Sequence, residues 1–420
     1  MANVNLLNFN QLATILNEIN AQATGSKGLA PVNESEFISV AQTTLQTGYD
    51  PVIQAISQVL GRTIFSVRPY DRKFKGLFMD EQRFGSRTRK LQAVDKPFEE
   101  DDRIKLVDGQ SIDQQRVNKP VVLETNYYGQ NVYQKSITIF RDQLDTAFSS
   151  SAEFGRFVSM IMQNIQDQIE QAHENTARAV VSNLIGAKKA ISGTDTGKTH
   201  VLYLVDAYNA ETGASLTRDQ ILSGDNFPKF AKWLYGFLKT LSGMMSERSY
   251  QYHLDITGKP VARHTPVRMQ KMYLFTPYVN RVGASVLADV YHDELLQYAD
   301  HEEVNYWQAI KAPAEISVTP AYIDNNGEIV ENPEAVAIDY VLGVIFDEEA
   351  AGITTVNQWN AAAPFNARGG YTNFFWHFTD RYNLDLTENA VVLVLDTEEG
   401  SESSSVVGTA VVGTATVGGN

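Results

Sequence analysis

The 420-residue chain contains no cysteine, which excludes disulfide bonds, thiolate metal sites and a cysteine nucleophile. It also lacks any run of roughly 18 to 20 uncharged apolar residues, the length that a membrane-spanning helix needs. The first residues, MANVNLLNFNQLATILNEIN, have neither the basic start nor the continuous apolar stretch of a secretion signal. We therefore expect no membrane insertion and no export, with assembly in the cytosol.

Basic residues are in deficit as well. The chain has 35 Lys and Arg against 50 Asp and Glu, a formal net charge of -15. A protein that reads duplex DNA normally presents a basic face, so this balance argues against that class. Apolar residues make up 43% of the chain, enough for two or three packed units of about 150 residues each. The sequence thus predicts a folded, acidic protein.

Two adjacent blocks of opposite charge stand out in the first third of the chain. Residues 62–90 hold nine basic residues against three acids, and residues 95–113 hold seven acids against three bases. One interpretation is a solvated loop, because charge runs usually face water. The other is a two-stranded arm whose charged edges meet complementary charges on neighbouring copies. The candidate contact residues of that arm are Arg72, Lys73, Arg83, Arg87, Arg89, Glu99, Glu100, Asp101 and Asp102.

Hydrophobic periodicity predicts several elements in the first half of the chain. Apolar residues at helical spacing predict short amphipathic helices at 6–19 and 50–60, joined by a looser stretch, and residues 120–139 favour a strand. A much longer helix is predicted at 150–186, where Ser150 and Glu153 have the spacing of a capping box. At 1.5 Å per residue such a helix would be about 50 Å long. An extended structure is therefore expected around it.

The second half mixes helices and strands without a regular repeat. Residues 200–206 read as a strand, residues 227–245 and 280–299 as helices, and residues 271–277, 315–324 and 338–350 as strands. An alternating stretch then runs through residues 371–396 and ends in the apolar AVVLVLD. Irregular mixing of this kind is typical of an α+β fold. The final segment repeats VVGTA at 406–410 and 411–415, which favours a flexible tail, although its β-branched residues would also suit an edge strand.

Two segments with possible site chemistry are weak candidates. The stretch ISGTDTGKTH at 191–200 resembles a phosphate loop, but only three residues separate Gly193 from Gly197, and a helix precedes it instead of a strand. The acidic segment 291–303 contains His292 and His301, which are nine residues apart and so point to different faces of one helix. Neither nucleotide binding nor a metal site is expected at these places. The remaining histidines have no partners nearby in sequence.

Aromatic density is highest in NARGGYTNFFWHFTDRYNL, residues 366–384, where His377, Asp380 and Arg381 suggest a catalytic pocket. In a strand, however, successive side chains point to opposite faces. His377 and Arg381 would then share one face, and Asp380 would lie on the other. The alternation favours a long sheet strand with one buried aromatic face over a catalytic site.

In its order of parts the sequence resembles the major capsid proteins of tailed bacteriophages with the Hong Kong 97-type fold, especially the shell proteins of small short-tailed phages. The resemblance rests on FGRFVSMIMQNIQDQIEQAHEN in the long helix and on PFNARGGYTNFFWHFTDRYNLDLTENAVVLVLD near the end. It implies an α+β fold with an N-terminal arm (1–61), an extended loop (62–118), a peripheral domain (119–226) with a spine helix (150–186), an axial domain (227–365), closing strands (366–399) and a low-complexity tail (400–420).

The resemblance also implies a structural role without catalytic residues, metal or cofactor. The expected partners are further copies of the chain in hexamers and pentamers, a separate scaffolding protein, a portal protein, and double-stranded DNA that the shell encloses without sequence-specific binding. Assembly would take place in the cytoplasm of the bacterial host, and the product would be the capsid of the virion. Some members of the family crosslink a lysine to an asparagine, but no local pattern assigns that reaction here.

Two alternatives stay open at the level of sequence. An encapsulin-like compartment would use the same fold to enclose cargo enzymes, although its subunit is usually shorter. An enzyme would use His377, Asp380 and Arg381, or the acidic segment 291–303. The contents of purified particles would separate the first alternative from a phage shell, and an effect of His377→Ala on activity without loss of assembly would support the second.

Overall fold

The computed structural model describes residues 8–25, 28, 30–60, 73–79, 88–96, 98–113, 115, 117, 119–127, 130–195, 197–256, 258–287, 301–330 and 334–398. The chain divides into two compact units, each built from three separate segments. Unit 1 comprises residues 1–85, 129–176 and 353–381, and unit 2 comprises residues 86–128, 177–352 and 382–420. The repeat tail from residue 399 onward lies outside the described residues.

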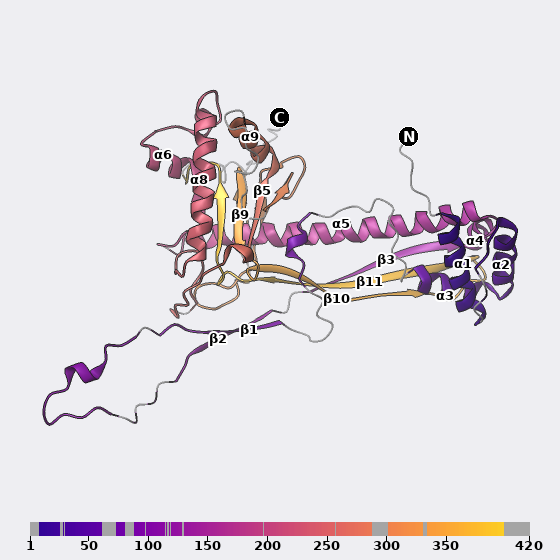
Figure 1. The fold of residues 1–420 in the computed structure, drawn as a ribbon, viewed down its shortest axis with the longest axis horizontal. Coiled ribbons are helices and arrows are strands. Elements are labelled where there is room, and N and C mark those ends of the chain that lie inside the picture. Colours follow the sequence, from indigo (N-terminus) through magenta and orange to yellow (C-terminus); the bar gives the residue numbers. More distant parts are fainter. Residues whose placement is uncertain are drawn as a thin grey trace, which may run out of the picture. The chain divides into compact units, whose positions relative to one another are not determined.

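Unit 1 begins with three helices, α1 (Phe9–Thr24), α2 (Glu34–Gln46) and α3 (Tyr49–Leu60) (Figure 1). The outer two agree with the sequence prediction, whereas the looser stretch expected between them contains α2. The Asn33 side chain caps α2 by accepting a hydrogen bond from the backbone amide of Glu36. Phe37 and Ala41 are buried on one side of it. The short apolar stripe of α2 is why the sequence pattern gave no helix there.

Helix α5 (Ser151–Ser192) is the longest element of the chain and contributes residues to both units. Its 42 residues correspond to about 63 Å at 1.5 Å per residue, and it ends six residues later than predicted. Ser150 accepts a hydrogen bond from the Glu153 amide, as expected for a cap. The Glu153 carboxylate, however, pairs with Arg156 at 2.7 Å. The predicted capping box is thus half formed.

A three-stranded sheet completes unit 1, in the order β10 (Ala351–Ala362), β11 (Tyr371–Leu384) and β3 (Gln130–Phe140). Strand β11 pairs antiparallel with β3, and its residues alternate between a covered and an open face. Phe374 and Trp376 on the covered face join the core formed by α1, α2, α3, the short helix α4 (Arg141–Ala147) and the start of α5. One 3-10 turn, η1 (Lys75–Leu77), also belongs to this unit.

Unit 2 is organised around a five-stranded mixed sheet in the order β4 (Val201–Tyr203), β12 (Ala390–Val394), β9 (Val341–Asp347), β5 (Gln270–Phe275) and β6 (His301–Val304). Every residue of β9 and β12 is buried, which explains their continuous apolar sequences. Helix α8 (Asn226–Ser246) packs Phe230, Leu234 and Leu238 against one face of this sheet.

The remaining elements of unit 2 are α6 (Leu204–Thr212), α7 (Arg218–Ile221), α9 (Thr276–Leu287), β7 (Ile316–Val318), β8 (Val336–Ile338) and η3 (Val267–Met269). Two predictions were wrong here. A strand was predicted at 200–206, but the observed strand β4 ends at Tyr203 and helix α6 begins at the next residue. Leu204 and Val205 are buried as the first residues of that helix. Residues 301–303 form part of a strand paired with β5 instead of a helix, and residues 288–300 lie outside the described part.

Gly343 lies on strand β9, opposite Leu274 of the neighbouring strand β5. A Cβ at this position would come within 2.6 Å of the Tyr273 carbonyl oxygen and of Leu274 Cδ2. The backbone oxygen belongs to a paired central strand and cannot move aside without disturbing the ladder.

We expect Gly343→Ala to lower the free energy of unfolding by about 1–3 kcal/mol, because it overfills a packed sheet. Urea unfolding of the unassembled chain would measure the change. Gly236→Ala in α8 is the control, since a Cβ there meets open space and should raise helix stability by up to about 1 kcal/mol. Equal unfolding midpoints for wild type and Gly343→Ala would contradict the close-approach explanation.

Lys188, near the end of α5, is fully buried in unit 2. Its ammonium donates to the Tyr252 carbonyl at 3.1 Å and lies 3.5 Å from Nδ1 of His200, whose Nε2 is 2.9 Å from Asp195. Burial lowers the pKa of Lys188 to about 7, with repulsion from Lys198 acting in the same direction. Burial also lowers the pKa of His200 to about 2, which keeps that ring neutral.

The lowered pKa of Lys188 predicts a specific dependence of stability on pH. Between about pH 7 and 10 this lysine is protonated in the unfolded chain and neutral in the folded chain. The free-energy cost of burying Lys188 on folding therefore falls as pH rises. The stability advantage of Lys188→Met over wild type should therefore shrink by about 2 kcal/mol from pH 7 to pH 9. Urea unfolding at both values tests this, with the exposed Lys239→Met as control. A difference independent of pH would refute the prediction.

Candidate functional site

The end of the basic block, residues 88–90, and the acidic block, residues 95–113, belong to a two-stranded arm of unit 2. Strands β1 (Thr88–Ala93) and β2 (Val122–Tyr127) pair antiparallel, with Lys90 opposite Thr125. The sequence analysis placed the residues of β1 in a charged loop and predicted a single strand at 120–139. The structure divides that single strand into β2 and β3. Between β1 and β2 the described residues include a 3-10 turn, η2 (Asp102–Lys105) (Figure 1). All described residues from 98 to 122 are exposed.

A dense ion-pair network fixes the base of the arm. The Lys90 ammonium lies 2.9 Å from Asp385 and 3.1 Å from Glu349, and it also pairs with Glu388. Arg263 reaches Glu388 at 3.1 Å. The side chains of Asp385 and Glu388 are almost entirely buried, so water does little to screen these charges. The network joins residues about 300 positions apart in the sequence.

The pKa values of this network follow from burial and from the neighbouring charges. Burial alone would raise the pKa of Asp385, but Lys90 and the hydrogen bonds from Thr387 more than offset it and hold the pKa below its usual value. For Glu388 burial prevails over Lys90 and Arg263, and its pKa is raised. Burial would lower the pKa of Lys90, yet Asp385 and Glu388 keep it above the usual value. The lysine is therefore charged and strongly held.

Asp95 forms a second anchor just beyond β1. Its carboxylate accepts hydrogen bonds from the backbone amide of Ala262, from Arg248 and from the Tyr250 hydroxyl. The Ala262 amide is the main cause of a lowered pKa at Asp95, and Arg248 adds to it. The Asp95 amide donates in turn to the Pro260 carbonyl at 3.1 Å. The arm thus leaves the body of unit 2 from a fixed position.

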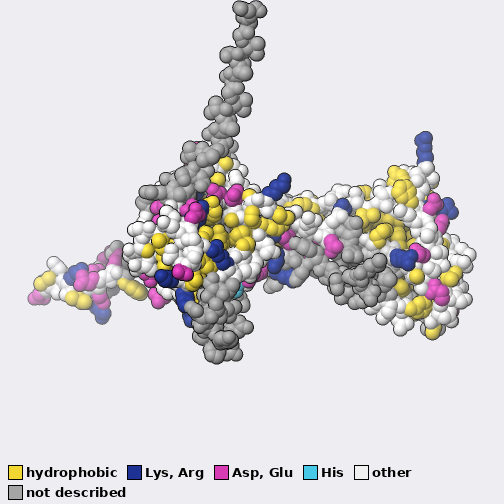
Figure 2. All heavy atoms as spheres, turned by 90° about the horizontal axis from the view of Figure 1, so that it is seen from above, with side chains coloured by type: hydrophobic (Ala, Val, Ile, Leu, Met, Phe, Trp, Pro, Cys, Tyr) yellow, Lys and Arg dark blue, Asp and Glu magenta, His cyan; other side chains and the backbone are white. Residues whose placement is uncertain are grey.

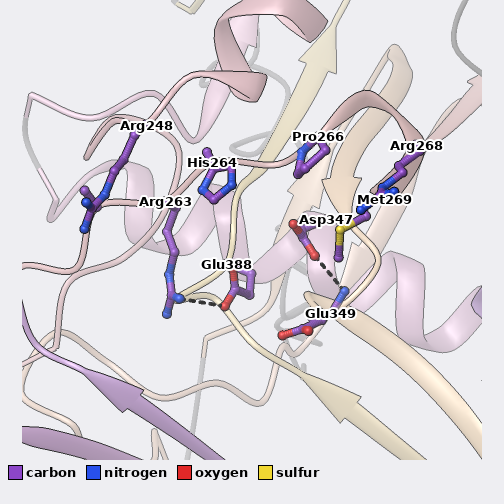
Figure 3. Close-up of a pocket in the computed structure, with 10 residues that line it drawn as sticks. Arg248, Arg263, His264, Pro266, Arg268, Met269, Asp347, Glu349 and Glu388 are labelled. Atoms are coloured by element: carbon purple, nitrogen blue, oxygen red, sulfur yellow. Dashed lines mark hydrogen bonds and ion pairs between the residues drawn. The ribbon is translucent and has the colours of Figure 1, made fainter.

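A cavity of about 500 Å³ opens beside these anchors (Figure 3). Its lining includes Arg248, Arg263, His264, Arg268, Glu349 and Glu388. We call it the unit 2 pocket. Figure 3 shows the Arg263–Glu388 ion pair on one side and the hydrogen bond from the Glu349 amide to Asp347, 2.9 Å long, on the other. His264, Arg268 and Glu349 are exposed, so the pocket presents charged side chains of both signs beside apolar ones such as Met269.

The far end of the arm is both acidic and apolar. Phe98 is fully exposed, and the exposed fractions of Ile104 and Val107 are 76% and 64%. Figure 2 shows hydrophobic and acidic side chains together at this end. Monomeric proteins rarely leave large apolar side chains clustered in water, and such clusters mark interaction surfaces. The arm end therefore has the composition of a contact surface.

The structure places the predicted contact residues in three groups. Arg72, Arg83 and Arg87 lie outside the described residues. Lys73 belongs to unit 1, where its amide donates to Glu174, and Arg89 is exposed on β1 next to the anchored Lys90.

The four predicted acids gather on the arm end and are all exposed. Three of them have local partners: Glu99 lies 3.8 Å from Lys96, Glu100 lies 2.6 Å from Lys105, and Asp101 lies 2.5 Å from Arg103. Asp102 begins the turn η2. Exposed pairs of this kind contribute little to stability and exchange readily for other partners. The four acids remain candidates for contacts with another molecule.

Strand β11 separates the residues of the suspected triad, as the alternation predicted. His377 lies on the open face and stacks on Trp359 with ring centroids 3.9 Å apart. Asp380 is fully buried on the covered face, 3.3 Å from His173 and 3.0 Å from the Thr355 hydroxyl. His377 and Asp380 thus belong to different environments and do not form one constellation.

The described ranges contain neither a metal-binding cluster nor a membrane-spanning helix. Within those ranges, no group of three or more His, Asp or Glu side chains is arranged to hold a metal ion. No helix of the described part is both long and apolar enough to cross a membrane. Residues 191–200 begin in the last turn of α5 and end just before β4, in the order opposite to that of a phosphate loop.

Sequence reasoning missed the residues that anchor the arm. Lys90 and Asp95 were counted only as members of charge blocks, and Asp385, Glu388 and Arg263 were not considered. The one available signal was the polar turn DLTEN, residues 385–389, between two apolar strands. Its pairing with Lys90 is a contact between distant segments, which a single sequence does not reveal.

We expect Lys90→Met to lower the free energy of unfolding by about 3 kcal/mol, the low end for breaking a buried ion pair, because its side chain keeps 18% exposure. Hydrogen exchange in β1 and β2 should accelerate at the same time. Arg89→Met is the matched control, since it removes the same charge from an exposed position on the same strand and should change stability by less than about 0.5 kcal/mol. Thermal unfolding and exchange of the unassembled chain measure both effects; similar losses in the two variants would rule out the anchor.

Comparison with solved structures identifies the fold. The chain is similar to one in the capsid structure of Staphylococcus phage Andhra, with 10% identity, 79% of this chain and 86% of that chain covered, and a TM-score of 0.51. A second similar chain, from the capsid structure of cyanophage P-SCSP1u, has 9% identity, covers 79% and 90% of the two chains, and has a TM-score of 0.45. The expected α+β capsid fold of the Hong Kong 97 type is confirmed.

A search of curated proteins found no match. A family model described as "Phi29-like phage major capsid protein" matches residues 12–394. That range includes most of α1, helices α2, α3 and α5, the arm, the three-stranded and five-stranded sheets and the final strand β12. Because the match spans nearly the whole described chain, the protein belongs to the Phi29-like phage major capsid protein family.

Proposed function

We propose that this major capsid protein assembles into hexamers and pentamers, which close into an icosahedral phage head around double-stranded DNA. The observation that carries the proposal is the anchored arm with a fully exposed apolar end. A single chain leaves Phe98 in water and yet holds the base of the arm with several ion pairs. A fixed base and an uncovered end suit a device that reaches a neighbouring copy.

Charge supports the container role. With a net charge of -15, the subunit gives DNA little general attraction to the wall, so confined DNA stays free to be packed and released. Binding of DNA is therefore enclosure without sequence-specific contacts. The role is structural and includes no catalytic step. A separate scaffolding protein and a portal protein complete the proposed assembly, which takes place in the host cytoplasm and ends in the virion.

The expected domain roles are proposed on the same basis. The N-terminal arm (1–61), the peripheral domain (119–226) with its spine helix and the closing strands (366–399) form the outer part of each hexamer or pentamer. The axial domain (227–365) surrounds its symmetry axis. The extended loop (62–118) lies over the next copy, where Arg72, Lys73, Arg83, Arg87, Arg89 and the acids Glu99, Glu100, Asp101 and Asp102 make contacts. The tail (400–420) is given no role.

Electron microscopy and size-exclusion chromatography test the proposal. The chain would be expressed alone and together with a candidate scaffolding protein. Uniform shells, tubes or rings of the size of a hexamer support it, and nuclease-resistant DNA in particles from infected cells supports the enclosure of a genome. A discrete monomer or dimer under both conditions would overturn the shell role.

We expect the combined variant Phe98→Ser, Ile104→Ser, Val107→Ser to fold like wild type and to lose assembly. These side chains are exposed in the single chain, so they stabilise an interface only when a partner buries them. The free energy gained is then roughly 25 cal/mol per Å² of apolar surface buried. Thermal unfolding would show the retained fold, and light scattering would show the lost assembly. Ile329→Ser, at a 71% exposed position outside the arm, is the comparison variant. Normal assembly of the triple variant would exclude the arm end as a contact surface.

A further inference from the structure

The base of the arm is attached to one short turn of unit 2, residues 385–389, which we call the anchor turn. Asp385 lies 2.9 Å from the Lys90 ammonium, and Glu388 pairs with the same ammonium. Both carboxylates are almost entirely buried. If the arm detaches and takes Lys90 with it, these carboxylates lose a cation. A buried carboxylate without a positive partner is costly, so another charge or a proton has to replace the lysine.

The two acids differ in what remains beside them after such a detachment. Arg263 still lies 3.1 Å from Glu388. Asp385 keeps its hydrogen bonds from the Thr387 amide and hydroxyl, which are neutral donors. Asp385 is therefore the acid for which a new positive charge matters most.

A second lysine, Lys188 of α5, is attached to the same turn from within unit 2. Its Nζ donates to the Tyr252 carbonyl at 3.1 Å, and that carbonyl also accepts a hydrogen bond from the Ala390 amide at 3.0 Å, directly after the turn. Two residues further on, the Leu254 amide donates to the Leu386 carbonyl at 2.8 Å. The fully buried Lys188 is thus joined to the anchor turn through one backbone segment.

The surroundings of Lys188 contain charges of both signs on three segments. The titratable and charged groups there are Asp195, Lys198, His200, His253, Asp255, Asp385 and Glu388. Burial lowers the pKa of both histidines, so they are neutral near pH 7. Lys198 pairs with Asp255 at 2.7 Å. Among the acids, Asp385 favours the charged form of Lys188 most strongly.

The charge of Lys188 depends on whether the arm is attached. With the arm in place, burial and repulsion from Lys198 outweigh the acids and lower the pKa of Lys188 to about 7. Removal of Lys90 takes a positive charge away from Asp385, so a proton on Lys188 becomes more favourable. The pKa of Lys188 is therefore higher with the arm detached than with the arm attached. Between these two pKa values, detachment takes up one proton.

We propose that Lys188 is a proton-dependent latch for the arm: when Lys90 leaves the anchor turn, a proton taken up by Lys188 replaces its charge beside Asp385. Because detachment binds a proton, low pH favours it and high pH opposes it. Above about pH 7 the equilibrium constant for detachment falls by up to about tenfold per pH unit, the limit for one proton. The latch goes beyond the shell function, since it belongs to the single chain and sets how firmly the arm is held.

Hydrogen exchange of the unassembled chain measures the detachment. The Asp95 amide donates to the Pro260 carbonyl, and the Ala262 amide donates to the Asp95 carboxylate, so both amides become free to exchange when the base of the arm leaves unit 2. Mass spectrometry would follow them between about pH 6 and 9 as protection factors, which correct for the faster chemical exchange at high pH. We expect protection to rise above about pH 7 by up to about tenfold per unit, and to level off below it.

Lys188→Met identifies the group that takes up the proton. This variant replaces the amine with an uncharged side chain of similar length, and the protection of the two amides should then hardly change between pH 7 and 9. Lys239→Met removes a lysine from an exposed position of α8 and should keep the wild-type slope. A slope that persists in Lys188→Met would assign the proton to another group, such as Asp385 itself, and would overturn the latch.

Wild-type protein alone also decides the question, whatever the variants do to folding. Protection that stays constant between pH 7 and 9 would contradict the proposal. Exchange of the two amides at the same rate as the amides of the buried strand β12 would show that the arm detaches only by global unfolding, which would also overturn it. None of these measurements involves assembly, so the shell function is tested separately.

Discussion

The ion pairs between the Lys90 ammonium and three carboxylates fix the base of the arm, and the position of the whole arm depends on them. An arm end can find a partner efficiently only if its base is held in one orientation, since a freely swinging segment would lose more conformational entropy on binding. Asp385 and Glu388 lie in a turn between two strands of the molecule, so Lys90 connects the arm directly to the framework of unit 2. Asp95 then sets the direction in which the chain leaves that framework.

The same network illustrates why buried charge is kept in a structural protein. Three carboxylates around one lysine and one arginine are no better for stability than a well-packed apolar core would be. They do, however, specify a single arrangement, because any shift leaves a buried charge unpaired. The raised pKa of Glu388 beside the lowered pKa of Asp385 shows that the two acids are not equivalent. The network thus defines one position for the base of the arm.

The sequence predicted what depends on local periodicity and missed what depends on distant contacts. Helix α5, helix α8 and the alternation of β11 follow from apolar spacing alone, and each was located to within a few residues except for the end of α5. Helix α2 was missed because only Phe37, Ala41 and Thr44 are buried in it. The strand ending at Tyr203 and the anchor at Lys90 are decided by partners far along the chain, which no local pattern contains.

The discontinuous make-up of the two units sets the order of events during synthesis. The central strand of the unit 1 sheet, β11, comes from residues 371–384, and β12 of unit 2 follows it directly. Neither unit can therefore close its sheet until nearly all of the described chain has left the ribosome. At about 5–20 residues per second the arm at 88–127 is made many seconds before the turn at 385–388 that anchors it. A nascent chain thus presents the arm without its fixed base until synthesis is almost complete.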